Sequence, residues 1–182
     1  MSLNLKTVKR LLIFLISIVF NSCSAQQIVA LNDNAIKITL PKEAVSLTKA
    51  EARAHLEKNF KGRMSPETVI SNHSAQKVFL IKDKLFSTRG SNAEVMADHV
   101  SKTKLGLDEL FKSSPTYSSF IKRYSDKSGI VISYIHDDVK IYKFYFYSNN
   151  REKAATGTLA CKLDDKEGAD LINKLLKGLK FN

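Results

Sequence analysis

Cysteine is scarce in this sequence, and the catalytic motifs that are recognisable by their spacing are missing. Cys23 and Cys161 are its two cysteines in 182 residues, so disulfide bonds cannot form a framework for the fold. The chain contains no phosphate-binding glycine-rich loop, Cys-x-x-Cys pair, His-Glu-x-x-His helix or Gly-x-Ser-x-Gly turn. Catalytic groups also assemble from distant positions, so these absences disfavour an enzyme without excluding one.

A long apolar run is also missing. Residues 11–20 are apolar apart from Ser17, and Lys6, Lys9 and Arg10 precede them. A helix needs about 20 apolar residues to cross a bilayer, and this run has about half of that. A short apolar core behind a basic leader is typical of a signal peptide, so we expect residues 1–22 to be one.

The end of this leader offers two cleavage sites. Phe20-Asn21-Ser22-Cys23 resembles the lipobox of bacterial lipoproteins, in the relaxed form of the Bacteroidetes group. Cleavage before Cys23 would expose a cysteine for diacylglycerol and an acyl chain such as palmitate, which together give stable anchoring. Residues 23–33 would then be a tether, followed by a single domain over residues 34–182. The alternative is cleavage after Ala25, which would release a soluble periplasmic or secreted protein.

The residues after Cys23 and the net charge bear on location and partners. Residues 24–27 lack the acidic cluster that resembles a surface-export signal, which favours a periplasm-facing place on the outer membrane. The leader holds three of the 29 basic residues and none of the 18 acids, so an excess of eight positive charges remains. The lysines are scattered, as on a solvated surface, and the sequence predicts contact with a membrane but not with nucleic acid.

The first half of the domain predicts a strand, a helix, a hairpin and a second helix. The strand covers residues 35–40. Thr48 and Glu51 have the spacing of a capping box, which predicts a helix up to residue 60. Residues 77–81 and 85–88 predict a hairpin. Ser91 or Asn92 would cap the second helix, whose apolar positions are Met96, Val100, Leu107 and Phe111.

The second half predicts strands followed by a helix. The strands cover residues 120–124, 130–135, 139–147 and 156–163, and Asp137-Asp138 would form a two-residue turn that pairs Ile132 with Lys143. Both faces of this hairpin are apolar, so both need cover. The stripe Ile172, Leu175, Leu176 and Leu179 supplies a helix for one face. We therefore expect an α+β fold, an antiparallel sheet flanked by helices on both faces.

This order of elements resembles the PsbP-like fold. The local resemblance lies in residues 36–41 at the start of the domain and residues 172–181 at its end. The fold is shared by the extrinsic photosystem II subunit, a Ran-binding nuclear import factor and DcrB-like bacterial lipoproteins, and these proteins have no catalytic residues in common. The resemblance implies a non-catalytic accessory or binding module.

One aromatic stretch is the candidate binding surface. Residues 141–147 alternate along a strand, so that Lys143, Tyr145 and Tyr147 share a face with Tyr134. The first interpretation is that these side chains fill the core on both sides of a central strand. The functional interpretation is that they form a rigid, amphipathic patch for a protein partner.

The histidines give weaker signals. His136 with Asp137 and Asp138 is the best cluster, but a metal site needs further ligands and a supporting shell, so we expect a solvated turn, no metal and no cofactor. The sequence favours a cell-envelope accessory lipoprotein that binds a protein or another envelope component. The alternatives are a small periplasmic hydrolase or ligand-binding enzyme with a site near His136, and a purely structural envelope component.

Overall fold

The computed structural model describes residues 26–60 and 65–182. Its strands are β1 (Gln27–Leu31), β2 (Ile36–Leu40), β3 (Ala44–Leu47), β4 (Lys77–Ile81), β5 (Lys84–Asn92), β6 (Ser118–Arg123), β7 (Lys127–His136), β8 (Val139–Ser148), β9 (Lys153–Lys162) and β10 (Leu179–Phe181). Its helices are α2 (Lys49–Asn59), the 3-10 helix η1 (Pro66–Thr68), α3 (His99–Leu110) and α4 (Gly168–Lys177). The domain is mixed α/β with antiparallel sheets, as the sequence predicts.

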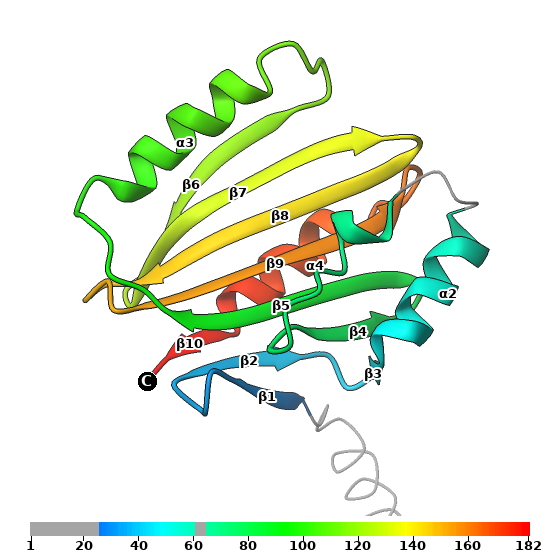
Figure 1. Ribbon diagram of the computed structural model, residues 1–182, viewed down its shortest axis with the longest axis horizontal. Coiled ribbons are helices and arrows are strands. Elements are labelled where there is room, and N and C mark those ends of the chain that lie inside the picture. Colours follow the sequence, from blue (N-terminus) through cyan, green and yellow to red (C-terminus); the bar gives the residue numbers. More distant parts are fainter. Residues whose placement is uncertain (1–25, 61–64) are drawn as a thin grey trace, which may run out of the picture.

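Seven strands form the large sheet, in the order β3-β4-β5-β9-β8-β7-β6 (Figure 1). The predicted register between β7 and β8 is confirmed, because Ile132 pairs with Lys143. The turn between them is Asp137-Asp138, with φ of 46° and 66°. A two-residue hairpin turn of type I′ needs positive φ at both of these positions. The predicted hairpin of β4 and β5 is also present, and its turn is Lys82-Asp83.

A second, three-stranded sheet has the order β1-β2-β10. The sequence places β1 in a tether and the end of β10 in a helix, and both expectations are wrong. Val29 and Leu31 of β1 are buried against the core, and Leu179 is fully buried where β10 pairs with β2. Pairing with β2 on both of its sides decides the conformation of these two strands.

The larger core lies between one face of the large sheet and α4. Phe86, Phe144 and Phe146 from the sheet share a buried cluster with Ile172 and Leu175 from the helix. Figure 1 shows α4 running behind β9 and β8. The apolar stripe at i, i+3 and i+4 is therefore the side of α4 that faces the sheet, as the sequence predicts.

The opposite face of the sheet carries a smaller core under α2. Ala52, Leu56 and Phe60 of this segment pack with Leu85 and other apolar residues of the sheet. The helix begins at a capping box, in which Glu51 N–H donates to Thr48 Oγ1 at 3.2 Å and Thr48 N–H donates to Glu51 Oε2 at 2.8 Å. Both features confirm the sequence prediction.

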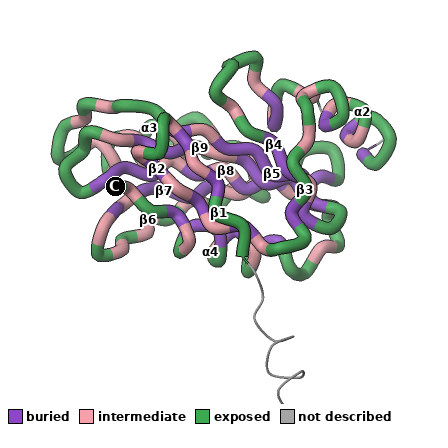
Figure 2. Tube along the Cα trace, turned by 90° about the horizontal axis from the view of Figure 1, so that it is seen from below, coloured by how far each residue is buried: buried purple, intermediate pink, exposed green. Residues whose placement is uncertain are grey.

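The helix α3 differs from its prediction. It begins at His99, with Asp98 as the N-cap, whereas Ser91 and Asn92 lie in β5. Met96 is 75% exposed, and α3 has no fully buried residue. Figure 2 shows its surface as exposed or half-buried, in contrast to the purple central strands. The predicted start of the helix at Ser91 or Asn92 is wrong because β5 continues its pairing with β9 up to Asn92.

The predicted leader and Cys23, the predicted lipid acceptor, lie outside the described residues. Within the described ranges, no helix combines the length and hydropathy that a membrane crossing requires.

Candidate functional site

The candidate site lies on the face of the large sheet between α3 and the segment that follows α2. Figure 1 shows strands β8 and β9 running between α3 on one side and α2 on the other. A pocket of about 260 Å³ lies here. The segment 67–76 forms its wall, and β5, β9 and β8 form its floor.

The floor is a grid of side chains from three neighbouring strands. Thr156 of β9 pairs with Arg89 of β5 and with Tyr145 of β8. One row along, Thr158 of β9 pairs with Ser87 and with Lys143. Residues two apart on a strand point to the same face, so these six side chains line the same pocket. The register therefore brings two cations and four hydroxyl groups together.

The wall is held by hydrogen bonds rather than by regular structure. Gln76 Oε1 accepts from the Ser71 N–H at 2.7 Å, and Gln76 Nε2 donates to the Val69 carbonyl at 3.0 Å. Ser87 Oγ donates to the same carbonyl at 2.6 Å, which attaches the segment to the sheet. Val69 and Ile70 bury their side chains in the core beneath α2, so the wall has a fixed place.

The two cations of the floor have few partners. Arg89 Nε donates to Thr156 Oγ1 at 3.4 Å, and the Lys143 ammonium lies 5.8 Å from the centre of the Tyr134 ring. Within the described residues, no carboxylate lies within ion-pair distance of either group. Glu67 is on the rim, where its carboxylate accepts from Ser65 Oγ and lies 3.9 Å from Arg53.

Tyr134 connects the site to α3. Its ring stacks on Phe111, with centroids 5.4 Å apart, and Phe111 stacks on Tyr117 at 5.0 Å. Burial raises the pKa of the Tyr134 hydroxyl above its usual value of 10.0. Tyr134 is thus half-buried, with its ring between α3 and Lys143.

Tyr147 does not contribute to an open patch. Its side chain is buried, and its hydroxyl lies 2.9 Å from Nε2 of His99 at the start of α3. Burial, and secondarily Tyr145, raise the pKa of this hydroxyl. The predicted group of four therefore divides: Lys143 and Tyr145 line the pocket, and Tyr134 and Tyr147 pack against α3.

His136, the centre of the alternative site, lies at the end of β7 beside the Asp137-Asp138 turn. His136 side-chain exposure is 52%, its Nε2 lies 3.6 Å from Asp137, and it lines neither the pocket nor the groove described below. In residues 26–60 and 65–182, no three His, Cys, Asp or Glu side chains are grouped so that they could hold a metal ion.

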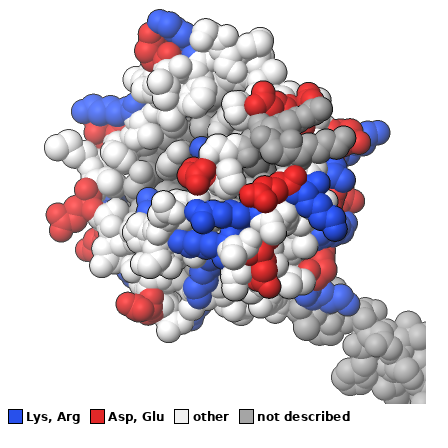
Figure 3. All heavy atoms as spheres, turned by 45° about the vertical axis from the view of Figure 1, so that its right-hand side comes forward, with Lys and Arg blue, Asp and Glu red and all other residues white. Residues whose placement is uncertain are grey.

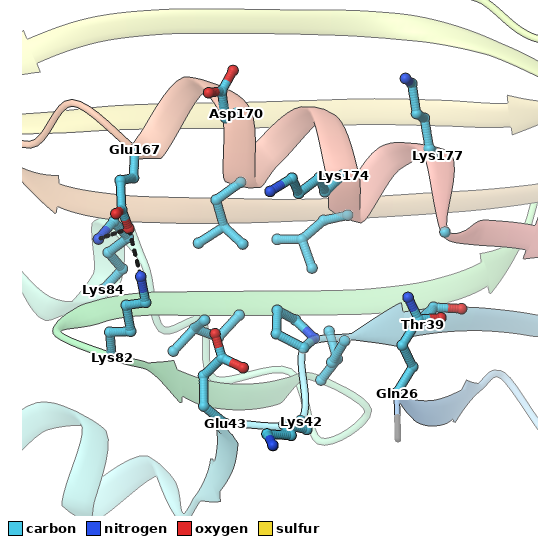
Figure 4. A pocket seen from close by; sticks show the side chains of 16 residues that line it. Gln26, Thr39, Lys42, Glu43, Lys82, Lys84, Glu167, Asp170, Lys174 and Lys177 are labelled. Atoms are coloured by element: carbon cyan, nitrogen blue, oxygen red, sulfur yellow. Dashed lines mark hydrogen bonds and ion pairs between the residues drawn. The ribbon is translucent and has the colours of Figure 1, made fainter. Parts of the chain in front are cut away.

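A larger groove of about 760 Å³ lies between α4 and the connection from β2 to β3. Figure 4 shows Glu43 pointing into it, and Asp170 and Lys177 pointing away from it. Lys82 and Glu167 close one end with an ion pair of 2.8 Å. Gln26, the first described residue, lines the groove.

The lysines at the closed end of the groove are neutralised within the fold. Lys84 is 3% exposed, and its ammonium lies 2.5 Å from Asp165 and 3.2 Å from Asp83. Burial alone would lower the pKa of Lys84, but the hydrogen bonds to Asp165 and Asp83 outweigh it and raise the pKa. This cluster is a structural ion pair, in contrast to Arg89 and Lys143.

Other charged side chains are distributed as on an ordinary protein surface. Figure 3 shows basic and acidic side chains interspersed on one side of the molecule, with some basic ones gathered near the middle. Cys161 is fully buried beside α4, as expected for a small apolar core residue, and burial raises the pKa of its thiol to about 12. A thiol with this pKa is protonated at neutral pH and is a poor nucleophile.

Two structures of the protein Mog1 are among the solved structures that match this chain. The Saccharomyces cerevisiae Ran-binding protein Mog1p matches at 10% sequence identity and a TM-score of 0.46, covering 87% of this chain and 96% of that chain. A mutant of Mog1 matches at the same identity and TM-score, covering 86% of this chain and 95% of that chain. No protein-family model and no curated protein matches the sequence.

Proposed function

We propose that the chain is a non-catalytic accessory lipoprotein of the bacterial cell envelope that binds a protein or another envelope component. Cys23 carries the lipid, and the domain from β1 onward carries the binding surface. The observation that supports binding is the pocket on the open sheet face. There, Lys143 and Tyr145 stand beside Arg89, without a carboxylate partner for either cation among the described residues.

The position of Gln26 supports an orientation in which the groove beside α4 lies near the membrane. Gln26 lies three positions after Cys23, and an extended chain spans at most about 3.5 Å per residue. A lipid on Cys23 would therefore keep the groove beside α4 within about 10 Å of the membrane surface. The two buried clusters on opposite faces of the large sheet support the PsbP-like arrangement.

The lipid anchor is tested by labelling cells with radioactive palmitate. We expect label in the native protein and in Cys161→Ala, whose buried thiol serves as the matched control, and no label in Cys23→Ala. The Cys23→Ala protein should also leave the membrane fraction. Equal labelling of Cys23→Ala would contradict the anchor, and an unlabelled native protein beginning at Gln26 would indicate soluble export.

The binding surface is tested with site-specific photo-crosslinkers in living cells. A crosslinker at position 145 should trap a defined envelope component, and the adduct should be lost when Lys143→Gln is added. A crosslinker at Leu163, which is 46% exposed and lies outside the pocket, is the control. Equal adducts at positions 145 and 163, unaffected by Lys143→Gln, would contradict a specific surface.

A further inference from the structure

The pocket on the sheet face has the side chains and the geometry of an anion-binding site. Arg89 and Lys143 stand on β5 and β8, on either side of β9 and one row apart in the grid. Neighbouring strands are about 4.8 Å apart, so both long side chains can reach a group that rests on Thr156 and Thr158. An arginine fork and a lysine ammonium converging on hydroxyl groups are typical ligands of phosphate and carboxylate.

The charges of these two side chains are not balanced within the described chain. Elsewhere in the domain, the buried lysines have carboxylate neighbours: Asp165 and Asp83 for Lys84, and Asp126 at 3.0 Å for Lys127. Arg89 is half-buried, and its one hydrogen bond to a described residue is to a neutral threonine. A desolvated cation without a counter-charge is unfavourable, and an anionic ligand would supply that charge.

The hydroxyl groups of the floor can donate to the same ligand. In the described part of the chain, neither the Thr158 hydroxyl nor the Tyr145 hydroxyl has a hydrogen-bond partner. Among the described residues that line the pocket, Glu67 of the wall is the one carboxylate. The Ser65 hydroxyl, and secondarily the Glu67 backbone, hold the pKa of this carboxyl below its usual value. Its partners are Ser65 Oγ and, at 3.9 Å, Arg53, and not Arg89 or Lys143.

We propose that this pocket binds an oxyanionic group, a phosphate or a carboxylate, carried by the envelope component that the domain recognises. The proposal deepens the proposed function and rests on it for the source of the ligand. A volume of about 260 Å³ is below the range of whole small-molecule sites. It accommodates one charged group, with the rest of the ligand outside, beside Tyr145 and the wall.

The experiment uses the full-length chain in zwitterionic detergent micelles. Inorganic phosphate is titrated while the backbone amide signals of Thr156 and Thr158, which every variant retains, are followed by NMR. In a second arm, phosphatidylglycerol is added to the micelles, which offers the same group on a lipid. Arg89→Gln and Lys143→Gln remove the cations, and Arg123→Gln and Lys166→Gln are matched controls at exposed positions outside the pocket.

We expect the Thr156 and Thr158 amide signals to move saturably with phosphate. Each site variant should raise the dissociation constant about tenfold, since a hydrogen bond to a charged group contributes about that much, and each control should change it less than about twofold. Arg89→Lys should restore part of the binding. If phosphatidylglycerol competes with phosphate, the ligand is a lipid headgroup; if it does not, the ligand is soluble. Both results support an oxyanion site.

Two results would overturn the proposal. One is a dissociation constant that neither Arg89→Gln nor Lys143→Gln changes. The other is a loss of binding in Arg123→Gln and Lys166→Gln as large as in the site variants, which would indicate attraction by net charge alone. Because micelles hold the chain whether or not Cys23 carries lipid, failure of the lipid anchor would appear in palmitate labelling and not in this titration.

Discussion

At the scale of single residues, Gly157 shows how the floor of the pocket depends on the core beneath it. It lies in β9 between Thr156 and Thr158. A Cβ at this position would meet the Ser87 carbonyl oxygen and the Phe144 ring. The missing side chain therefore lets Phe144 pack directly under the strand that carries the pocket hydroxyls.

The first prediction concerns this glycine. Gly157→Ala should lower the free energy of unfolding by about 1–3 kcal/mol, because overpacking displaces an aromatic ring or the neighbouring strand. Gly106→Ala is the control, since a Cβ there has open space in an exposed helix and should raise stability by up to about 1 kcal/mol. Urea unfolding of both variants measures the difference, and equal effects would contradict the packing argument.

Lys84 is a second position at which a single substitution is expected to lower the free energy of unfolding strongly. Lys84→Met should lower the free energy of unfolding by about 3 kcal/mol, because it leaves Asp165 buried without its counter-charge. Lys82→Met is the control: its ion pair with Glu167 is more than half exposed, so solvent screening makes its expected contribution to stability much smaller than that of Lys84. Thermal or urea unfolding measures both, and a larger loss in Lys82→Met would refute the assignment.

The same cluster predicts a pH dependence. Burial alone would raise the pKa of Asp165, but its hydrogen bonds with Lys84 and with the backbone N–H groups of Glu167 and Gly168 together outweigh burial and hold the pKa below the usual 3.8. A carboxyl whose pKa is lower in the folded state binds fewer protons there, so its stabilisation is present above about pH 4 and is lost as the pH falls further. Unfolding between pH 6 and 3 should show this loss in the native protein and less of it in Lys84→Met.

At the scale of elements, α3 is attached to the sheet by few contacts. Asp108 accepts hydrogen bonds from the Tyr117 hydroxyl at 3.0 Å and from the Ser119 hydroxyl, and Phe111 stacks on Tyr134. The helix itself has no fully buried residue. Elements with little buried apolar surface open most readily, so the side of the pocket next to α3 is the more adaptable one.

Asp108→Ala should therefore increase amide hydrogen exchange in α3 by about fivefold or more, the effect of about 1 kcal/mol, with little change in β8 and β9. Asp98→Ala, which removes an exposed ion pair with Lys102, is the control and should alter exchange in the first turn at most. Exchange followed by mass spectrometry measures both. Uniform acceleration throughout the domain would contradict independent opening of α3.

At the scale of the whole molecule, the small sheet joins the two ends of the described chain. β2 lies between β1 and β10, and the side chain of Leu179 inserts into the core beside Ile38. β1, the first described strand, is thus fixed directly to the core through its pairing with β2.

Leu179→Ala should lower the free energy of unfolding by about 2–5 kcal/mol, the usual cost of a cavity in a core. Leu163→Ala, at a position that is 46% exposed, should change it by less than about 1 kcal/mol. Urea unfolding of the two variants compares the same substitution inside and outside the core. Similar values would show that β10 is not part of the cooperative unit.

Elements with a clear local pattern were predictable from the sequence. The capping box of Thr48 and Glu51 satisfies backbone donors within one turn. The apolar stripe of α4 and the alternation of apolar residues in β7 and β8 indicate which face of each element is buried. Each of these signals depends on neighbours a few residues away, so the sequence by itself determined these elements and their register.

The tertiary structure decided the small sheet, the true start of α3 and the membership of the pocket. No sequence pattern placed Arg89 beside Thr156 and Thr158. These residues come from strands β5 and β9, which pair although they are more than sixty residues apart in the chain. Tyr147 had the same alternation as Tyr145, yet it is buried because α3 covers its end of the strand. Which side chains meet across a sheet, and which of them a helix covers, depends on long-range packing that no local pattern encodes.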